Sequence, residues 1–290
     1  MKSWSFNDVR IYVLGFSVFI WAYLSPELSR CREFAFDWLA QIWARNFLTL
    51  LTVAGGLHLY FYTFGKQSTL EKYEAKPPRV HSKVFHFNNQ VWDNMFWTLL
   101  GTVTILSAYE AVMMWAYANQ FNDALTFEQS PIWFCLLIFL IPGWTGLHFY
   151  WQHRAFHIPI LYKLGHHWHH KNINVGPWSG AAVHPIENLV WFTAVLVLLL
   201  IPSHPIHALF LMQLQVITAI TTHVGFENLV INGKTKFRLG DFYHQLHHRF
   251  YDCNYGTMAG PWDRLFSTYH DGTAAGDEKI RQRRKMLASR

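Results

Sequence analysis

The sequence predicts an all-α, polytopic membrane protein with about four to six membrane helices and a cytoplasmic, histidine-rich helical cap. Apolar residues make up 51% of the 290 residues and charged residues only 14%, whereas a soluble domain carries about 25% charged residues. The apolar residues gather in long runs, and many of the eighteen histidines lie in clusters between or after these runs. This composition excludes a disordered chain and disfavours a soluble cytosolic enzyme.

The membrane helices are expected at five apolar segments. The first, residues 11–24, is short for a crossing and indicates a signal anchor rather than a cleaved leader. The last, residues 188–226, is too long for one crossing, and Ser203-His204-Pro205 predicts a turn that divides it into two short helices. The others approach or exceed the roughly 20 residues that cross about 30 Å of hydrocarbon. They cover residues 46–65, 94–122 and 129–152, the last with a break at Pro142-Gly143.

Lysines and arginines give the expected orientation, because they concentrate in cytoplasmic loops. Residues 119–130 contain none, residues 66–92 carry five, and residues 223–290 carry eleven. We therefore expect residues 66–92, 153–187 and 223–290, and both chain ends, in the cytoplasm. The membrane would be the endoplasmic reticulum in a eukaryote or the inner membrane in a bacterium. The net charge of +6 suits a cytoplasmic membrane surface or an acidic partner, and a solvated basic face is the simpler alternative.

The histidines form three clusters with helical spacing. His153 and His157 form HxxxH; His166, His169 and His170 form HxxHH; and His244, His247 and His248 repeat HxxHH. Residues at positions i, i+3 and i+4 share one face of a helix. Each HxxHH box is therefore predicted to present its three imidazoles in one direction, on the cytoplasmic side of the membrane.

A metal centre is the reading that best accounts for so many imidazoles. Burying them together without a ligand would leave donors and acceptors unpaired, at roughly 1–3 kcal/mol each, whereas a metal takes one lone pair from each ring. Imidazoles suit zinc, copper, iron or nickel. Four ligands satisfy one zinc ion, so eight or more indicate two metal ions. His184 and His223 flank the 188–226 hairpin, which returns both to the same side. The predicted ligands are His153, His157, His166, His169, His170, His184, His223, His244, His247 and His248.

Carboxylates accompany the clusters at short spacing. Ligating histidines usually donate their other N–H to a carboxylate or a carbonyl, which fixes the tautomer. The candidates for this supporting role are Glu187, Glu227, Asp241 and Asp252, and ordinary surface acids are the alternative. His148 and His167 lie off the ligand faces, so we expect them to support the ligands or to pack. Beyond the metal ligands the sequence assigns no catalytic residue.

These motifs resemble those of the sterol desaturase and fatty acid hydroxylase superfamily, which are membrane di-iron oxidases. The resemblance covers roughly residues 130–270 and includes Gly176-Pro177-Trp178-Ser179-Gly180, Asn254-Tyr255-Gly256 and Trp262-Asp263-Arg264-Leu265-Phe266. The tail is most similar to the sterol C-5 desaturase and C-4 methyl oxidase branch. The extent of the resemblance divides the chain into three parts. Residues 1–129 would form membrane helices and a basic loop, residues 130–270 a catalytic domain, and residues 271–290 a basic tail. His148 departs from the pattern, since relatives often carry an acid in that region.

The resemblance implies an O2-dependent oxidation of a membrane lipid, such as a sterol, a fatty acid or a sphingolipid. It implies two iron ions in the histidine boxes, with zinc as a possible substitute in purified protein. Electrons would come from a cytochrome b5-type or ferredoxin-type donor, and no nucleic acid takes part. The sequence does not separate hydroxylation from desaturation, and an ether-lipid monooxygenase is a further alternative within this chemistry.

Two other classes of function compete with this one. A membrane zinc hydrolase would cleave a lipid ester or amide with a metal-activated water, and would need fewer ligands and a metal-bound carboxylate. A metal transporter or haem-type electron carrier would place its polar ligands near mid-membrane. The histidine clusters instead follow the apolar runs, and Glu110 is the one acid within a run.

Overall fold

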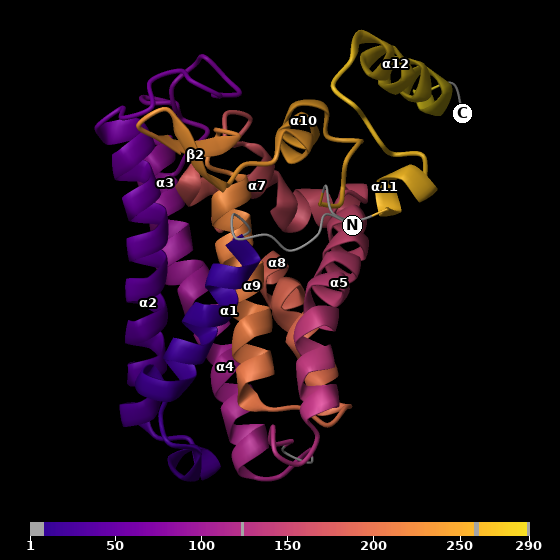
Figure 1. Cartoon of the computed structure of the whole chain (residues 1–290). Helices are drawn as coiled ribbons and strands as arrows, with labels where there is room; N and C mark the ends of the chain where they lie inside the picture. The colour runs from indigo at the N-terminus through magenta and orange to yellow at the C-terminus, as the bar shows by residue number, and fades with distance from the viewer. Residues whose placement is uncertain (1–8, 123–124, 258–260, 289–290) are drawn as a thin grey trace.

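The computed structural model describes residues 9–122, 125–257 and 261–288. Long helices stand side by side, and the short helices that carry the HxxHH boxes gather at one end of them (Figure 1). The helices of the first half are α1 (Val9–Phe19), continued by a π-helical turn (Ile20–Leu24); a 3₁₀ turn (Leu28–Arg32); α2 (Phe36–His58), continued to Thr63; and α3 (Gln90–Phe96), continued through Trp97–Thr102 into α4 (Val103–Ala118).

The second half begins with α5, the longest α-helix of the described chain. Its elements are α5 (Pro131–Phe156); α6 (Pro159–Leu161), continued through Tyr162–His166 into α7 (His167–His170); a 3₁₀ turn (Pro177–Ser179); α8 (Pro185–Trp191), continued by a 3₁₀ helix (Phe192–Leu199); α9 (Pro205–Thr222); β1 (Asn228–Ile231); β2 (Lys234–Arg238); α10 (Phe242–Phe250); α11 (Trp262–Leu265); and α12 (Ala274–Ala288).

Three helices of the described chain are long and apolar enough to cross a membrane: Gln90–Ala118, Pro131–Phe156 and Pro205–Thr222. Two shorter apolar helices, Val9–Leu24 and Pro185–Leu199, accompany them, which brings the apolar helices to five. The expectation of a mainly helical membrane protein is confirmed. The helix at residues 36–63, where we expected a crossing, is continuous but is not among the three.

Two helix interruptions were predicted from proline positions, and the structure contains only one of them in the described chain. The turn at Ser203-His204-Pro205 is confirmed: it separates the helix ending at Leu199 from α9, and the His204 side chain accepts a hydrogen bond from the backbone N–H of Ile206. The predicted break at Pro142-Gly143 is wrong, because α5 runs through both residues. A proline is tolerated inside a long membrane helix because neighbouring helices satisfy the backbone groups that it leaves unpaired.

A short antiparallel hairpin is the exception to the all-α prediction. Strands β1 and β2 pair with Ile231 opposite Lys234, and Asn232 and Gly233 between them both have positive φ, 52° and 70°. Asn-Gly is the residue pair that a two-residue hairpin turn with two positive φ values prefers. The sequence therefore contained the signal for this hairpin.

Helix α9 lies at the centre of the bundle and α5 at its outside. Nearly all of α9 is buried, whereas most residues of α5 are only partly buried or exposed. Helix α9 packs on α1, α4 and α5, so it connects the first half of the chain with the second. Because His223 directly follows α9, the central helix sets the position of one predicted ligand.

An ion pair inside the bundle explains the acid in an apolar run. Arg45 of α2 donates to Glu110 of α4, and both side chains are buried. Asn46 donates to Glu110 at 3.0 Å, and Gln213 of α9 donates to Asn46 at 3.2 Å. An isolated charge is costly in hydrocarbon, so acids there are usually paired. Glu110 thus belongs to a polar contact between α2, α4 and α9, away from the histidines.

Candidate metal centre

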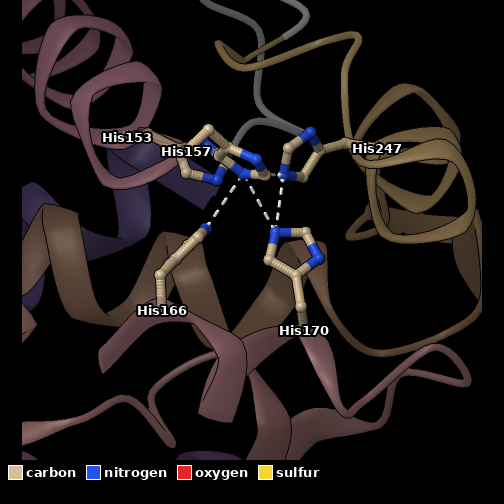
Figure 2. Close-up of side chains that lie close together, drawn as sticks. All are labelled: His153, His157, His166, His170 and His247. Carbon is tan, nitrogen blue, oxygen red and sulfur yellow. Dashed lines mark hydrogen bonds between the residues drawn. The ribbon is translucent and has the colours of Figure 1, made fainter. Parts of the chain in front are cut away.

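Nine of the ten predicted ligands converge at one end of the bundle, in two groups. The first contains His153, His157, His166, His170 and His247, and the second contains His169, His223, His244 and His248. Within each group the possible ligand nitrogens lie within 4.8 Å of one another. Figure 2 shows the first group, whose rings come from α5, from residues 166–170 and from α10 and point toward a common centre.

Each HxxHH box divides its histidines between the two groups, which corrects the prediction that each box faces one way. His166 and His170 join the first group and His169 the second, whereas His244 and His248 join the second and His247 the first. The physical reason is that residues i+3 and i+4 of a helix point about 100° apart. An HxxHH box that lies between the two groups can therefore contribute histidines to both of them.

The nitrogen positions fit a metal ion in each group. Nε2 of His157 lies 3.1 Å from Nε2 of His166, 3.1 Å from Nε2 of His170 and 3.2 Å from Nε2 of His247. In the second group Nε2 of His223 lies 3.3 Å from Nε2 of His169 and 3.0 Å from Nε2 of His248.

Hydrogen bonds alone do not explain these distances. A neutral imidazole carries a single N–H, so the His157 nitrogen cannot bond three neighbours. Nitrogens bound at about 2.0–2.1 Å to one metal ion lie roughly 2.8–3.4 Å apart at octahedral or tetrahedral angles. Nε2 of His153 and Nε2 of His244 are buried and have no hydrogen-bond partner. Metal coordination would satisfy both atoms.

Burial favours the neutral imidazoles that metals require. It lowers the pKa of the His223 ring to about 4. Burial, followed by repulsion from neighbouring imidazoles, also lowers the pKa of His157, His169, His170, His244, His247 and His248. Because a buried site disfavours the charged form, these rings keep a free lone pair at neutral pH.

Hydrogen bonds to Nδ1 fix the orientation of four of the rings. Nδ1 of His166 bonds Oε1 of Glu187 at 2.8 Å, as expected for one of the carboxylate candidates. The other three bond backbone carbonyls: His153 bonds Tyr255 at 2.6 Å, His247 bonds Cys253 at 2.6 Å and His223 bonds Ala219 at 2.8 Å. With Nδ1 carrying the proton, Nε2 is left as the ligand atom.

The remaining carboxylate candidates do not support a ligand ring in this way. Glu227 accepts from Tyr73 and from Arg238, and Asp252 accepts from Arg284. Both predictions are wrong. Each acid lies four residues from a histidine in the sequence, but these histidines, His223 and His248, join the second group instead. Asp241 caps α10 and accepts from the backbone N–H of His244 at 3.3 Å, so it holds the helix that carries the third box.

Three predicted histidines lie outside both groups. His184 caps α8, accepts from the backbone N–H of Ile186 at 3.2 Å and packs edge-on against Trp168. His148 bonds the Thr193 hydroxyl at 3.0 Å, and His167 is exposed. The hairpin returns His184 to the correct end, but its ring takes part in the cap of α8.

A cavity of about 520 Å³ opens beside the histidines. Histidines of both groups line it, and it continues between the helices to Pro142, Trp191 and Leu214. A cavity of this size is within the range that binds small molecules. It joins the candidate metal centre to the apolar interior of the bundle, where a lipid could reach the histidines.

Residues 137–268 match the family model described as fatty acid hydroxylase. This segment contains all nine histidines of the two groups. This part of the chain is therefore similar to the fatty acid hydroxylase family. No solved structure matches it.

Its similar relatives include sterol desaturases from fungi and plants. A Delta(7)-sterol 5(6)-desaturase of Aspergillus fumigatus is 28% identical over 57% of this chain and 45% of the relative. One of Candida albicans is 30% identical over 49% of this chain and 37% of the relative. A Delta(7)-sterol-C5(6)-desaturase of Nicotiana tabacum is 34% identical over 45% of this chain and 48% of the relative. The chain thus spans less than half the length of these three relatives.

Proposed function

We propose that this protein is a membrane-bound di-iron oxidase that hydroxylates or desaturates a lipid, using O2 and two electrons. The observation that carries the proposal is the pair of all-histidine groups beside a cavity that reaches among apolar helices. The groups are neighbours: the rings of His244 and His247 are centred 5.3 Å apart, and those of His170 and His248 are centred 5.0 Å apart.

The five histidines of the first group would hold one iron and the four of the second group the other. Two irons would supply the activation of O2 that an unreactive C–H bond requires. The chain contributes neutral rings, held by carbonyls and by Glu187 so that Nε2 faces each centre. Eight of the nine histidines are buried and His157 is partly buried, which would limit their contact with bulk water.

The proposed substrate is a membrane lipid, with a sterol first because the relatives named above are sterol desaturases. Pro142, Trp191 and Leu214 would surround its apolar body, and His153, His169 and His244 would lie beside the carbon that reacts. The centre would face the cytoplasm, where a cytochrome b5-type or ferredoxin-type protein would deliver electrons.

The hydrolase alternative has less support. A catalytic zinc ion is bound by three protein ligands, and one of them is often a carboxylate. In the described chain the two groups contain five and four residues, and all of them are histidines. Metal analysis therefore separates the two readings. The hydrolase reading expects one metal per chain, and the oxidase reading expects about two.

The decisive experiment compares the lipids of cells that express the protein with those of cells expressing His157→Ala, by mass spectrometry. His157 contacts three other histidines of its group, so its loss should abolish turnover. His86→Ala is the matched control, because His86 is half-exposed and bonds Asp93 outside both groups. A lipid 2 Da lighter indicates desaturation and one 16 Da heavier indicates hydroxylation. A product that forms without O2, or at full level in His157→Ala, would refute the proposal.

A further inference from the structure

In the turn at residues 253–256, which follows α10, two backbone carbonyls accept hydrogen bonds from histidines of different helices. The carbonyl of Cys253 accepts from Nδ1 of His247, on α10, and the carbonyl of Tyr255 accepts from Nδ1 of His153, on α5. Both distances are 2.6 Å, and both histidines belong to the first group. The directions of these two carbonyls therefore determine how the two rings face the centre.

A carbonyl direction is fixed by the N–H of the same peptide unit, because the unit is planar and the two groups point opposite ways. The N–H that belongs with the Tyr255 carbonyl is that of Gly256, and it donates to Oδ2 of Asp263 at 2.7 Å. The N–H that belongs with the Cys253 carbonyl is that of Asn254, and it donates to the Thr268 carbonyl at 2.9 Å. Behind the peptide unit that bonds His153 lies the Asp263 carboxylate, and behind the one that bonds His247 lies the Thr268 carbonyl.

Asp263 is the charged member of this arrangement. Its side chain is buried, and its carboxylate also accepts from the N–H of Tyr255 at 2.9 Å and from the Thr268 hydroxyl at 2.6 Å. These three donors and the Tyr243 hydroxyl, which also bonds the Asp263 side chain, compensate the buried charge, as a carboxylate in such a place requires. A negative charge on one side of a peptide unit polarises it and strengthens its carbonyl as an acceptor.

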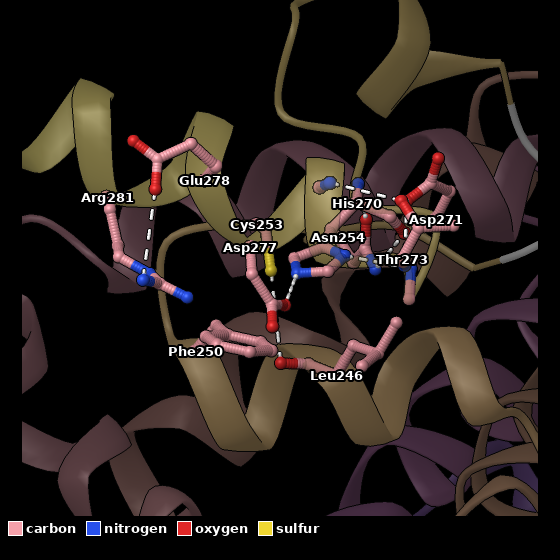
Figure 3. A network of polar contacts seen from close by, with 12 residues as sticks. Leu246, Phe250, Cys253, Asn254, His270, Asp271, Thr273, Asp277, Glu278 and Arg281 are labelled. Atoms are coloured by element: carbon pink, nitrogen blue, oxygen red, sulfur yellow. Dashed lines mark hydrogen bonds and ion pairs between the residues drawn. The ribbon is translucent and has the colours of Figure 1, made fainter.

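Asn254 locks the turn onto the C-terminal segment. It has positive φ, 54°, and is buried. Its side chain donates to the carbonyls of Tyr243 and His270, both at 3.0 Å, and accepts from the N–H of His270 at 2.7 Å. Figure 3 shows the part of this network around Asn254 and His270, and the His270 ring bonds Asp277 of α12 at 2.9 Å. The turn is therefore held from both sides and cannot rotate its carbonyls freely.

We propose that Asp263 is a positioning residue of the first metal site, acting on His153 through the peptide unit that joins Tyr255 to Gly256. The inference rests on the proposed function, since it requires metal at the histidines. It also gives a physical reason for Asn254-Tyr255-Gly256 and for the aspartate at position 263. A carboxylate usually bonds a ligating histidine directly; here one peptide unit stands between them.

The test measures metal retention in Asp263→Asn. The change keeps the size of the side chain, removes its charge and brings an amide N–H against a backbone donor. Loss of a supporting partner typically weakens metal binding about 10- to 100-fold. We load the purified protein with Zn²⁺ and apply a chelator concentration at which the unchanged protein keeps two equivalents. Asp263→Asn should keep one, because the side chains of the four second-group histidines make no hydrogen bond or ring contact with the described residues 251–257.

Asp271→Asn is the matched control. Asp271 lies in the same segment, and its carboxylate accepts hydrogen bonds from the N–H and the hydroxyl of Thr273. It should keep both equivalents. Thr268→Val is the second variant, used also if Asp263→Asn does not fold, because it removes one hydrogen bond to Asp263 and leaves the charge. Thr268→Val should lose the metal of the first histidine group at a lower chelator concentration than the unchanged protein.

The possible results separate the inference from the proposed function. Two equivalents retained by folded Asp263→Asn, or equal loss from both sites in Thr268→Val, would overturn the positioning role. Failure of the unchanged protein to bind Zn²⁺ would overturn that role and the metal centre together. A purely structural role would lower the melting temperature of metal-free protein without changing the ratio of the two sites.

Discussion

Replacing Glu187 by glutamine should weaken metal binding by the first group of histidines. The Glu187 carboxylate is buried and accepts from Nδ1 of His166 at 2.8 Å. A hydrogen bond to a charged group contributes about 1.5–3 kcal/mol and a neutral one about 0.5–1.5 kcal/mol. Glutamine can still accept, so the loss is about 1–1.5 kcal/mol, or roughly 5- to 12-fold in affinity. Alanine removes the acceptor as well and should cost more.

Chelator competition on purified protein measures this change. The matched control is Glu227→Gln, because Glu227 is also an acid near a histidine in sequence but bonds Tyr73 and Arg238. We expect both metals to be bound as tightly in Glu227→Gln as in the unchanged protein. Equal affinities in Glu187→Gln and Glu227→Gln, with both proteins folded, would refute the reasoning about the supporting carboxylate.

Three further predictions use other parts of the chain. His247→Ala should abolish lipid turnover at normal protein abundance, whereas His81→Ala, at an exposed position outside both groups, should not; an active His247→Ala protein would make the box structural. Gly180→Ala should lower the stability by about 1–3 kcal/mol, because a Cβ there would lie 2.1 Å from the Ala219 carbonyl; an unchanged melting temperature would contradict this. Reporters fused to the two chain ends should both report the cytoplasm, and an external C-terminus would overturn the proposed orientation.

Local patterns carried much of the prediction. Membrane helices follow from apolar runs of sufficient length, because each helix satisfies its own backbone hydrogen bonds. The HxxxH and HxxHH spacings identified eight histidines, and the ends of the 188–226 hairpin added His223. Glu187 was selected for its spacing from His184, but it bonds His166, which is twenty-one residues away along the chain.

Other features depended on contacts between distant segments. Nothing in the spacing of the HxxHH boxes shows that His169 and His247 would join different groups from their neighbours. His184 has the right position along the chain, yet its ring caps α8. The errors at Glu227 and Asp252 have the same origin: closeness along the chain does not determine which way a side chain faces.

The sequence by itself therefore determined the class of protein, the apolar helices and the histidines that could bind metal, because these properties depend on residues within a few helical turns of one another. Only the tertiary structure decided the division into two groups, the cavity beside them and the backbone carbonyls of Ala219, Cys253 and Tyr255 that orient three rings. Every residue carries a carbonyl, so no sequence pattern marks these three. Tyr255 acquires its role when α5 packs beside the segment that follows α10, which brings residues about a hundred apart along the chain into hydrogen-bond contact. Ala219 and Cys253 lie four and six residues from the histidines that they orient.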